Sequence, residues 1–154
     1  IQLYPWYMPL PQWMPSTIHQ EPAEYDLYAV SYKTNLSSFS QYNTNPWIAG
    51  FLDIEPYLLK IWINSETGRK KRLLDGEEVW VESKVARVKA RLKLSECVHP
   101  ECVAIGGTFG STFNHPIANG RGVHFNSLLP TGFKYTDPVG GGMEMGVRVK
   151  VYRA

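Results

Sequence analysis

The chain has 154 residues, of which 44% are hydrophobic and 19% are charged, and this balance indicates one folded globular domain and excludes a disordered chain. Its formal net charge of +2 is too small to predict nucleic acid or an acidic membrane surface as a partner. No apolar run approaches the ~20 residues that a membrane-spanning helix needs, so no direct membrane insertion is expected.

The opening residues, 1–24, are rich in proline and aromatic side chains. Their first part, 1–15, has neither a basic start nor a continuous apolar core, so it is not a signal peptide. The prolines of residues 1–15 exclude a helix there, and residues 1–24 are predicted to form an extended linker segment. An opening of this composition without an initiator methionine predicts that the chain was cut or matured from something longer. Its aromatic side chains are expected to pack on further domains.

Residues 25–32 form the first predicted strand because they are aromatic and β-branched. A long run of hydroxyl and amide side chains follows over residues 33–45. Pro46 then opens a predicted helix whose large apolar residues share one face. These residues are Trp47, Ile48, Phe51 and Leu52.

The next segment predicts a strand over residues 60–64 and a short basic helix over residues 66–73. Asn64 or Ser65 caps that helix, because an amide or hydroxyl oxygen can accept from a free backbone amide at the helix start. Asp75-Gly76 supplies the turn that follows.

Four further strands are predicted, over residues 77–82, 85–94, 101–105 and 147–152, the last of them able to serve as an edge strand. Residues 85–94 alternate apolar and basic side chains, so one face is buried and the other is charged. We interpret the basic row as the solvated face of the strand, with nucleic acid or a parent subunit as alternative contacts. The row consists of Arg87, Lys89, Arg91 and Lys93. Short strands with few helices favour a closed β-barrel.

Two long connections, residues 33–45 and residues 106–142, dominate the predicted architecture. Loops of this length in a compact domain are usually functional. Both are rich in hydrogen-bonding groups and poor in carboxylates, which suits a large, polar, anionic ligand. No acid–base pair or nucleophile assembly stands out, so the chain is expected to bind rather than to catalyse.

Cys97 and Cys102 are the only cysteines, and His99 lies between them. A zinc site needs four ligands, and these residues supply three at an unfamiliar spacing. Two thiols or one local disulfide at a turn near Pro100 is the preferred interpretation. The compartment stays undecided.

The order of these motifs resembles the C-terminal, molybdopterin-dinucleotide-binding domain of the dimethyl-sulfoxide-reductase family of molybdenum and tungsten oxidoreductases. The resemblance runs from Tyr25 to Ala154. It rests on an ordered series of sequence segments. These are residues 31–33 leading to residues 45–47, residues 63–64, residues 75–76 before residues 79–83, and residues 103–105, 122–128, 137–138 and 147–154.

What this resemblance implies is a mainly β fold, a six-stranded double-psi β-barrel over residues 25–154. In the family this domain closes over a molybdopterin guanine dinucleotide cofactor, in its bis form with molybdenum or tungsten, and the isolated domain is expected to lack it. The partners implied are the remaining domains of a larger catalytic subunit and an iron–sulfur electron-transfer subunit. The resemblance implies that the metal ligand and most substrate contacts lie in other domains, so this chain is expected to hold no complete active site.

The resemblance also implies which residues contact the cofactor. They are Tyr32, Lys33, Thr34, Ser40, Gln41, Asn45, Asn114, Asn126 and Asp137. Lys33 can make a charge-assisted bond to a phosphate, and Asn126 can donate and accept along a pterin or guanine edge. The alternatives stay open: a solvated strand end at 32–34, turn-forming side chains at 40–45, and a turn former at Asp137.

The passage 45–47 and its polar approach look most like the sulfur-compound reductases of the family, of the polysulfide or thiosulfate type. Ser38 and Phe39 depart from a frequent histidine, Gln41 from a frequent arginine, and His124 from a frequent asparagine. A different class also remains open, because double-psi barrels serve as peptide- or protein-binding modules without a cofactor.

Overall fold

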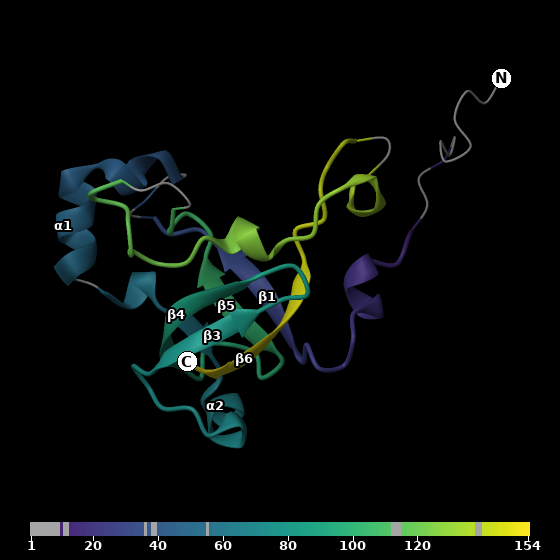
Figure 1. Cartoon of the computed structure of the whole chain (residues 1–154), viewed down its shortest axis with the longest axis horizontal. Helices are drawn as coiled ribbons and strands as arrows, with labels where there is room; N and C mark the ends of the chain where they lie inside the picture. The colour runs from purple at the N-terminus through teal and green to yellow at the C-terminus, as the bar shows by residue number, and fades with distance from the viewer. Residues whose placement is uncertain are drawn as a thin grey trace.

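The computed structural model describes residues 10, 13–35, 37, 40–54, 56–111, 115–137 and 140–154. Within these residues the chain forms six strands, two α-helices and five 3₁₀ helices (Figure 1). The strands are β1 (Leu27–Tyr32), β2 (Ile61–Ile63), β3 (Glu78–Glu82), β4 (Arg87–Leu94), β5 (Cys102–Gly106) and β6 (Val147–Arg153). The helices are α1 (Pro46–Ile54), α2 (Ser65–Lys71), η1 (Thr17–Gln20), η2 (Ser40–Thr44), η3 (Pro56–Leu59), η4 (Phe125–Leu128) and η5 (Phe133–Tyr135).

The strands close into a barrel in the order β1-β5-β2-β4-β3-β6. β1 and β5 run parallel, as do β2 and β4, whereas the other neighbouring pairs are antiparallel. Two parallel pairs interlocked in one closed sheet make a double-psi barrel, so the predicted fold class is confirmed. β6 pairs with β1 on one side and with β3 on the other, so the strand that was expected to be edge-capable leaves no open edge.

Alternate strand residues fill the interior of the barrel. On β4, Ala90 and Leu92 are buried, while Lys89 and Arg91 between and beside them are exposed, as the alternation predicts. The fully buried side chains of the strands include Ile61, Ile63, Val79, Val81, Leu92, Val103 and Val149. Burial of one such side chain contributes roughly 1.5–3 kcal/mol, so this apolar interior is the main source of stability.

α2 follows the predicted capping. The Asn64 side chain accepts a hydrogen bond from the Glu66 amide at 2.8 Å, and the helix ends where Arg72 adopts a left-handed conformation with φ 56°. In the turn after it, the Asp75 carboxylate accepts from the Leu94 amide at 2.7 Å. The turn is thereby tied to the end of β4. Among the described residues no helix is both long and apolar enough to cross a membrane.

α1 begins at Pro46 as predicted, and it buries only part of its apolar surface. Leu52 is 2% exposed and Ala49 is also buried, whereas Trp47 is 87% exposed and Phe51 faces solvent as well. The predicted helix is therefore present, but of its large apolar residues only Leu52 is buried. α1 lies outside the strands of the barrel, at the upper left of Figure 1.

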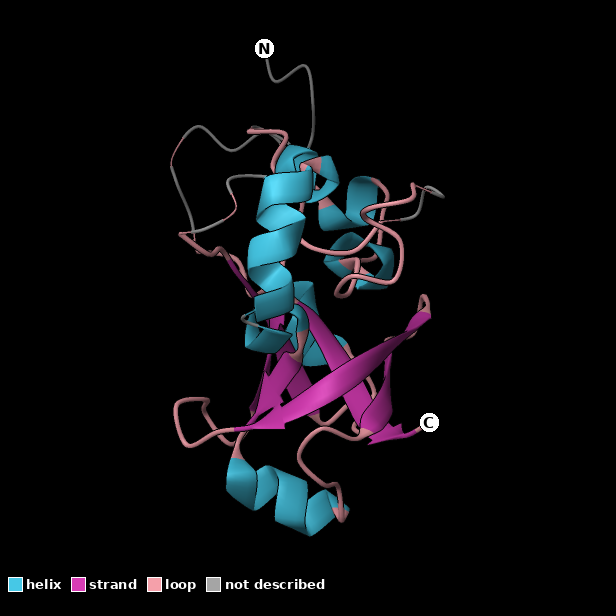
Figure 2. Ribbon diagram, turned by 90° about the vertical axis from the view of Figure 1, so that its left-hand side faces the viewer, coloured by secondary structure: helices cyan, strands magenta, loops and turns pink. Residues whose placement is uncertain are grey.

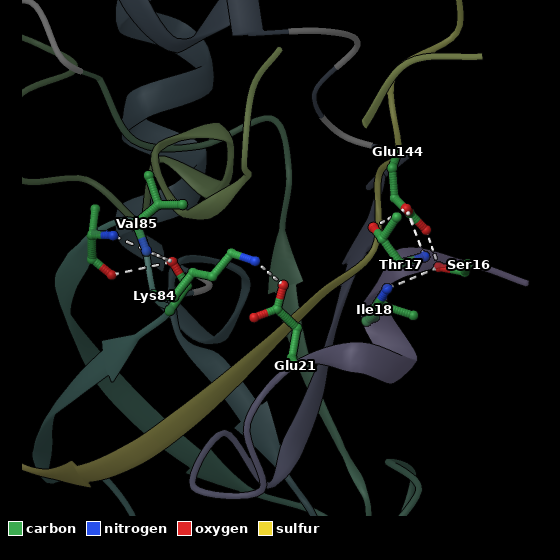
Figure 3. Close-up of polar contacts among 9 residues, drawn as sticks. Ser16, Thr17, Ile18, Glu21, Lys84, Val85 and Glu144 are labelled. Carbon is green, nitrogen blue, oxygen red and sulfur yellow. Dashed lines mark hydrogen bonds and ion pairs between the residues drawn. The ribbon is translucent and has the colours of Figure 1, made fainter. Parts of the chain in front are cut away.

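The segment before β1, residues 13–26, is held against the barrel by polar contacts (Figure 3). The Glu144 carboxylate accepts hydrogen bonds from the Ser16 hydroxyl and from the Thr17 hydroxyl and amide, the hydroxyl of Thr17 at 2.6 Å. Lys84 pairs with Glu21. We call residues 13–26 the strap. The boundary between a linker over residues 1–24 and the barrel over residues 25–154 stays a prediction.

Candidate functional site

The two long connections of the barrel lie at the same rim. Tyr32 at the end of β1 pairs with Gly106 at the end of β5, so both strands end together. β2 and β6 run antiparallel to these strands and therefore begin at that rim. The first connection, residues 33–60, and the second connection, residues 107–146, thus leave from and return to one end of the barrel, while α2 lies at the other end (Figure 2). We call this end the polar rim.

Hydrogen bonds join the start of the second connection to the first. The Asn43 side-chain amide donates to the Thr108 carbonyl. Beside this contact, the Gly107 amide donates to the Tyr32 carbonyl at 3.0 Å. Both connections therefore meet over the ends of β1 and β5, as an arrangement that surrounds a shared ligand requires.

Three buried polar atoms of the two connections have no hydrogen-bond partner in the part of the chain that the structure describes. They are Ser37 Oγ, Asn43 Oδ1 and Thr108 Oγ1, in residues that are 1%, 9% and 4% exposed. An unpaired buried polar atom costs about 1–3 kcal/mol, so native proteins rarely leave several of them unpaired without a reason. Hydroxyl and amide oxygens in this state are what a ligand or an ordered water would satisfy.

The predicted residues at the end of β1 lie at the rim but in different surroundings. The Tyr32 hydroxyl donates to the Leu58 carbonyl at 3.5 Å, and burial raises the pKa of this phenol. Lys33 is exposed. The Thr34 hydroxyl accepts from the Ser37 amide at 3.2 Å, which is the local turn bond that was the alternative interpretation.

Of the predicted residues before α1, Asn45 has a clear structural use. Its side-chain oxygen accepts from the Trp47 amide at 2.9 Å and so caps α1. Ser40 begins η2 and is exposed, and Gln41 lies in the same 3₁₀ helix. These three residues therefore lie within the first connection at the polar rim. The Asn45 side-chain oxygen is already used to cap α1.

The predicted residues of the second connection are spread along it. Asn126 is exposed on η4, and its side chain makes no hydrogen bond within the described residues. Asp137 lies on the far arm of the connection, at the start of a turn in which its amide donates to the Gly142 carbonyl at 2.8 Å. Asn114 lies outside the described residues.

A charged contact fixes α1 to the second connection. The Arg121 guanidinium donates to both Asp53 carboxylate oxygens, at 2.5 and 3.0 Å, and to the Ala49 carbonyl at 3.1 Å. The hydrogen bond to Arg121 lowers the pKa of Asp53. This contact sets where the first connection lies relative to the second.

The sequence interpretation missed Ser37, Asn43 and Thr108 as a group. Ser37 and Asn43 belong to the polar run that was recognised, but nothing in their spacing shows which side chains turn inward. Thr108 follows two glycines after a strand end, a weak signal on its own. Only the meeting of β1 with β5, whose paired residues Tyr28 and Cys102 are 74 positions apart in sequence, brings Asn43 and Thr108 into contact.

The cysteines are free thiols. Cys97 is exposed and Cys102 is half-buried, and burial raises the pKa of the Cys102 thiol. Of the two alternatives, two free thiols rather than one local disulfide agree with the structure. Across the described ranges, no three His, Cys, Asp or Glu side chains gather as metal ligands would.

The fold and the rim define the class of protein: a double-psi β-barrel domain whose two long connections gather polar groups at one end. The chain belongs to the family described as "Molydopterin dinucleotide binding domain", whose sequence model matches residues 27–147. It is thus a molybdopterin-binding domain of the dimethyl-sulfoxide-reductase family, as its motifs indicated.

Two known proteins are similar to this chain, one in sequence and one in fold. The thiosulfate reductase molybdopterin-containing subunit PhsA of Salmonella typhimurium is 25% identical over 95 residues, which are 61% of this chain and 12% of that protein. Acetylene hydratase from Pelobacter acetylenicus shares the fold, with a TM-score of 0.75 at 19% sequence identity. The matched part is 96% of this chain and 22% of the hydratase chain. The chain thus spans a small part of either relative.

Proposed function

We propose that the polar rim binds a molybdopterin guanine dinucleotide cofactor. The observation that carries this proposal is the meeting of two polar connections at one rim, where the buried oxygens of Ser37, Asn43 and Thr108 have no hydrogen-bond partner among the described residues. Membership of a dinucleotide-binding family supports the same ligand. Pterin and guanine rings carry both N–H donors and carbonyl acceptors, which matches a rim of hydroxyl and amide groups.

The side chains at the rim fit such a group. Asn126 is exposed with its amide unpaired among the described residues, so it can donate and accept on one ring edge. Lys33 is exposed next to the strand end and carries the charge that a phosphate oxygen prefers. When bound, the cofactor supplies the oxidation–reduction chemistry. The chain's own part is to orient the rings, neutralise phosphate charge and exclude water.

The chain would serve as the cofactor-closing domain of a larger molybdenum or tungsten oxidoreductase. The match to a thiosulfate reductase subunit, which this chain covers only in small part, supports a reductase of the thiosulfate or polysulfide type. In that setting the partners are the remaining domains of the catalytic subunit and an iron–sulfur electron-transfer subunit. The turnover then belongs to the whole protein and not to this domain.

A protein-binding module is the second candidate, and one observation favours it. α1 exposes Trp47 at 87% and Ile54 at 79%, with Phe51 between them, so one helix face is apolar and uncovered. Residues spaced in this way form a stripe that another protein surface could cover. Packing of the stripe against another domain of the same subunit would account for it without a separate function.

Titration of the 154-residue chain with guanosine diphosphate and with a free pterin, followed by amide NMR shifts, separates the two candidates. If the rim binds the cofactor, the amide shifts of residues 32–34 and 125–128 should change. Asn126→Ala should weaken binding at least about tenfold, because the hydrogen bonds between this amide and the pterin or guanine ring are lost. Gln20→Ala is the matched control, an exposed amide on a different 3₁₀ helix. Absence of saturable binding, or equal effects of both substitutions, would reject the rim as the site.

A further inference from the structure

The strap meets the second connection where that connection returns to the polar rim. The last part of the second connection leaves the core after Leu129, which is buried, and re-enters it at Val147, the first residue of β6. We call its described residues, 131–137 and 140–146, the return arm. In Figure 1 the return arm extends away from the barrel, and η1 of the strap lies on the same side of the molecule.

The strap contacts the return arm directly (Figure 3). The Glu144 carboxylate of the return arm accepts hydrogen bonds from the hydroxyls of Ser16 and Thr17 in the strap. Ile18 packs on Gly146, since a Cβ added to Gly146 would lie 3.0 Å from the Ile18 Cδ1. Gly146 directly precedes β6, so the strap touches the return arm at the residue where the arm reaches the rim.

The turn between β3 and β4 holds the strap and the return arm with one side chain. The Lys84 ammonium pairs with Glu21 of the strap and lies 5.3 Å from the centroid of the Tyr135 ring in the return arm. Hydrogen bonds with Glu21 and Tyr135 raise the pKa of Lys84. The turn is itself fixed, because the buried Ser83 hydroxyl accepts from the Val85 amide at 3.2 Å. Lys84 therefore presents its cation from a fixed turn to both segments.

Neither segment is anchored in the core along its length. Of the strap only Tyr25, next to β1, is buried, and no described residue of the return arm is buried. The return arm is joined within itself, since the Glu144 amide donates to the Tyr135 carbonyl and the Asp137 amide to the Gly142 carbonyl, both at 2.8 Å. Segments with few buried apolar contacts open at low cost in free energy. The position of the return arm therefore depends on its contacts with the strap and with Lys84.

We propose that the strap is a latch for the return arm, and that docking of the strap is coupled to ligand binding at the polar rim. In the docked state Glu144 and Lys84 hold the two segments together. In the released state both side chains face water and the return arm can move away from the rim.

A ligand at the rim needs the second connection in place, so it favours the docked state, and a docked strap favours the ligand by the same free energy. Any protein contact that lifts the strap would thereby weaken binding at the rim. The latch stands on the contacts of the strap and the return arm, whereas its coupling to the rim rests on the proposed function.

Hydrogen exchange in Ser16→Ala/Thr17→Val tests the latch without any ligand. The two substitutions remove the hydroxyl donors to Glu144. The amides at 133–137 and 141–146 should exchange at least about fivefold faster, because the return arm loses a support. Ser65→Ala/Ser95→Ala is the matched control, since it removes two half-buried hydroxyls at the end of the barrel opposite the rim. Unchanged exchange of the return arm in the strap variant, or equal acceleration in the control, would overturn the latch.

Lys84→Met tests the same latch from the barrel side. Loss of the cation should speed the exchange of the amides at 16–20 and of those at 133–137 together, because one ammonium holds both segments. Lys70→Met is the matched control, an exposed cation on α2 that pairs with Glu66, and it should change neither segment. Faster exchange of the strap with an unchanged return arm would overturn the latch, because the two segments would then move independently.

Titration with guanosine diphosphate tests the coupling. Ser16→Ala/Thr17→Val should weaken its binding at least about fivefold, and saturating nucleotide should slow exchange at 16–20 in the unaltered chain by a comparable factor. Faster exchange of the return arm with unchanged nucleotide affinity would overturn the coupling. Absence of saturable binding to the unaltered chain would reject the proposed function of the rim, and exchange of the return arm would still decide the latch.

Discussion

At the scale of single residues, Gly110 decides whether the second connection can cross itself at the rim. It has φ 77°, and a Cβ there would lie 2.2 Å from the His124 nitrogen and 2.3 Å from the Val123 carbonyl carbon. Both obstacles are backbone atoms, which cannot move aside as a flexible side chain can. The Gly110 amide also donates to the Arg121 carbonyl at 2.8 Å, so the crossing is fixed from both sides.

Gly110→Ala is therefore expected to lower the free energy of unfolding by at least about 2 kcal/mol, because left-handed strain and a backbone clash add. Gly141→Ala serves as the control, since Gly141 also has a left-handed φ of 68° but open space where a Cβ would stand. It should cost only about 1–2 kcal/mol. Urea unfolding followed by circular dichroism measures both, and equal losses would show that strain alone, without the clash, sets the cost.

At the scale of elements, the strands could be predicted from the sequence, but the packing of α1 and of the strap against the barrel could not. Alternation of small apolar and charged residues marks β4 regardless of what lies around it. α1 shows the limit: its spacing predicts a helix, but which face is buried depends on the barrel and on Arg121, 68 residues beyond Asp53. The strap depends on contacts over a still larger separation, such as Thr17 with Glu144, 127 residues apart.

Glu144 gives the strap a pH dependence whose direction can be stated. Burial acts to raise the pKa of this carboxyl, but hydrogen bonds from Ser16 and Thr17 outweigh it, so the pKa is lowered. A carboxyl with a lowered pKa in the folded state stabilises that state at pH above its unfolded value, about 4.3. This stabilisation is lost as the pH falls through the lower folded-state value.

Hydrogen exchange should therefore show the amides at 16–20 protected at pH 6 and progressively less protected below about pH 4.3. In Glu144→Gln the same amides should be weakly protected at both pH values, because the neutral amide is a poorer acceptor for three donors. Glu66→Gln removes an exposed carboxylate on α2 and should leave strap protection unchanged. Equal protection of the Glu144 variant and the unaltered chain at pH 6 would mean that the strap is held by other contacts.

At the scale of the whole molecule, the barrel is closed by its last strand. β6 pairs with β1 through Leu27 and Val149 and with β3 through Val81 and Val151, so this one strand joins the two ends of the strand order and closes the barrel. These pairings join residues far apart in sequence, and the parallel pairs cannot form locally either. Folding of the rim therefore depends on closure at the far end of the chain. No single stretch of sequence contains that information, which is why a barrel could be predicted but its junctions could not.

Val149→Asp should abolish cooperative folding of the whole barrel. Val149 is 0% exposed, and an unpaired carboxylate there costs several kcal/mol, a large share of the roughly 5–15 kcal/mol that stabilises a domain. Val85→Asp is the matched control, the same change at a residue that is 52% exposed in the turn between β3 and β4, and it should cost less than about 0.5 kcal/mol. Thermal unfolding followed by circular dichroism distinguishes them. A cooperative transition within a few degrees of the unaltered chain in Val149→Asp would mean that β6 is dispensable, and the barrel would then have to close through β1 and β3 in some other way.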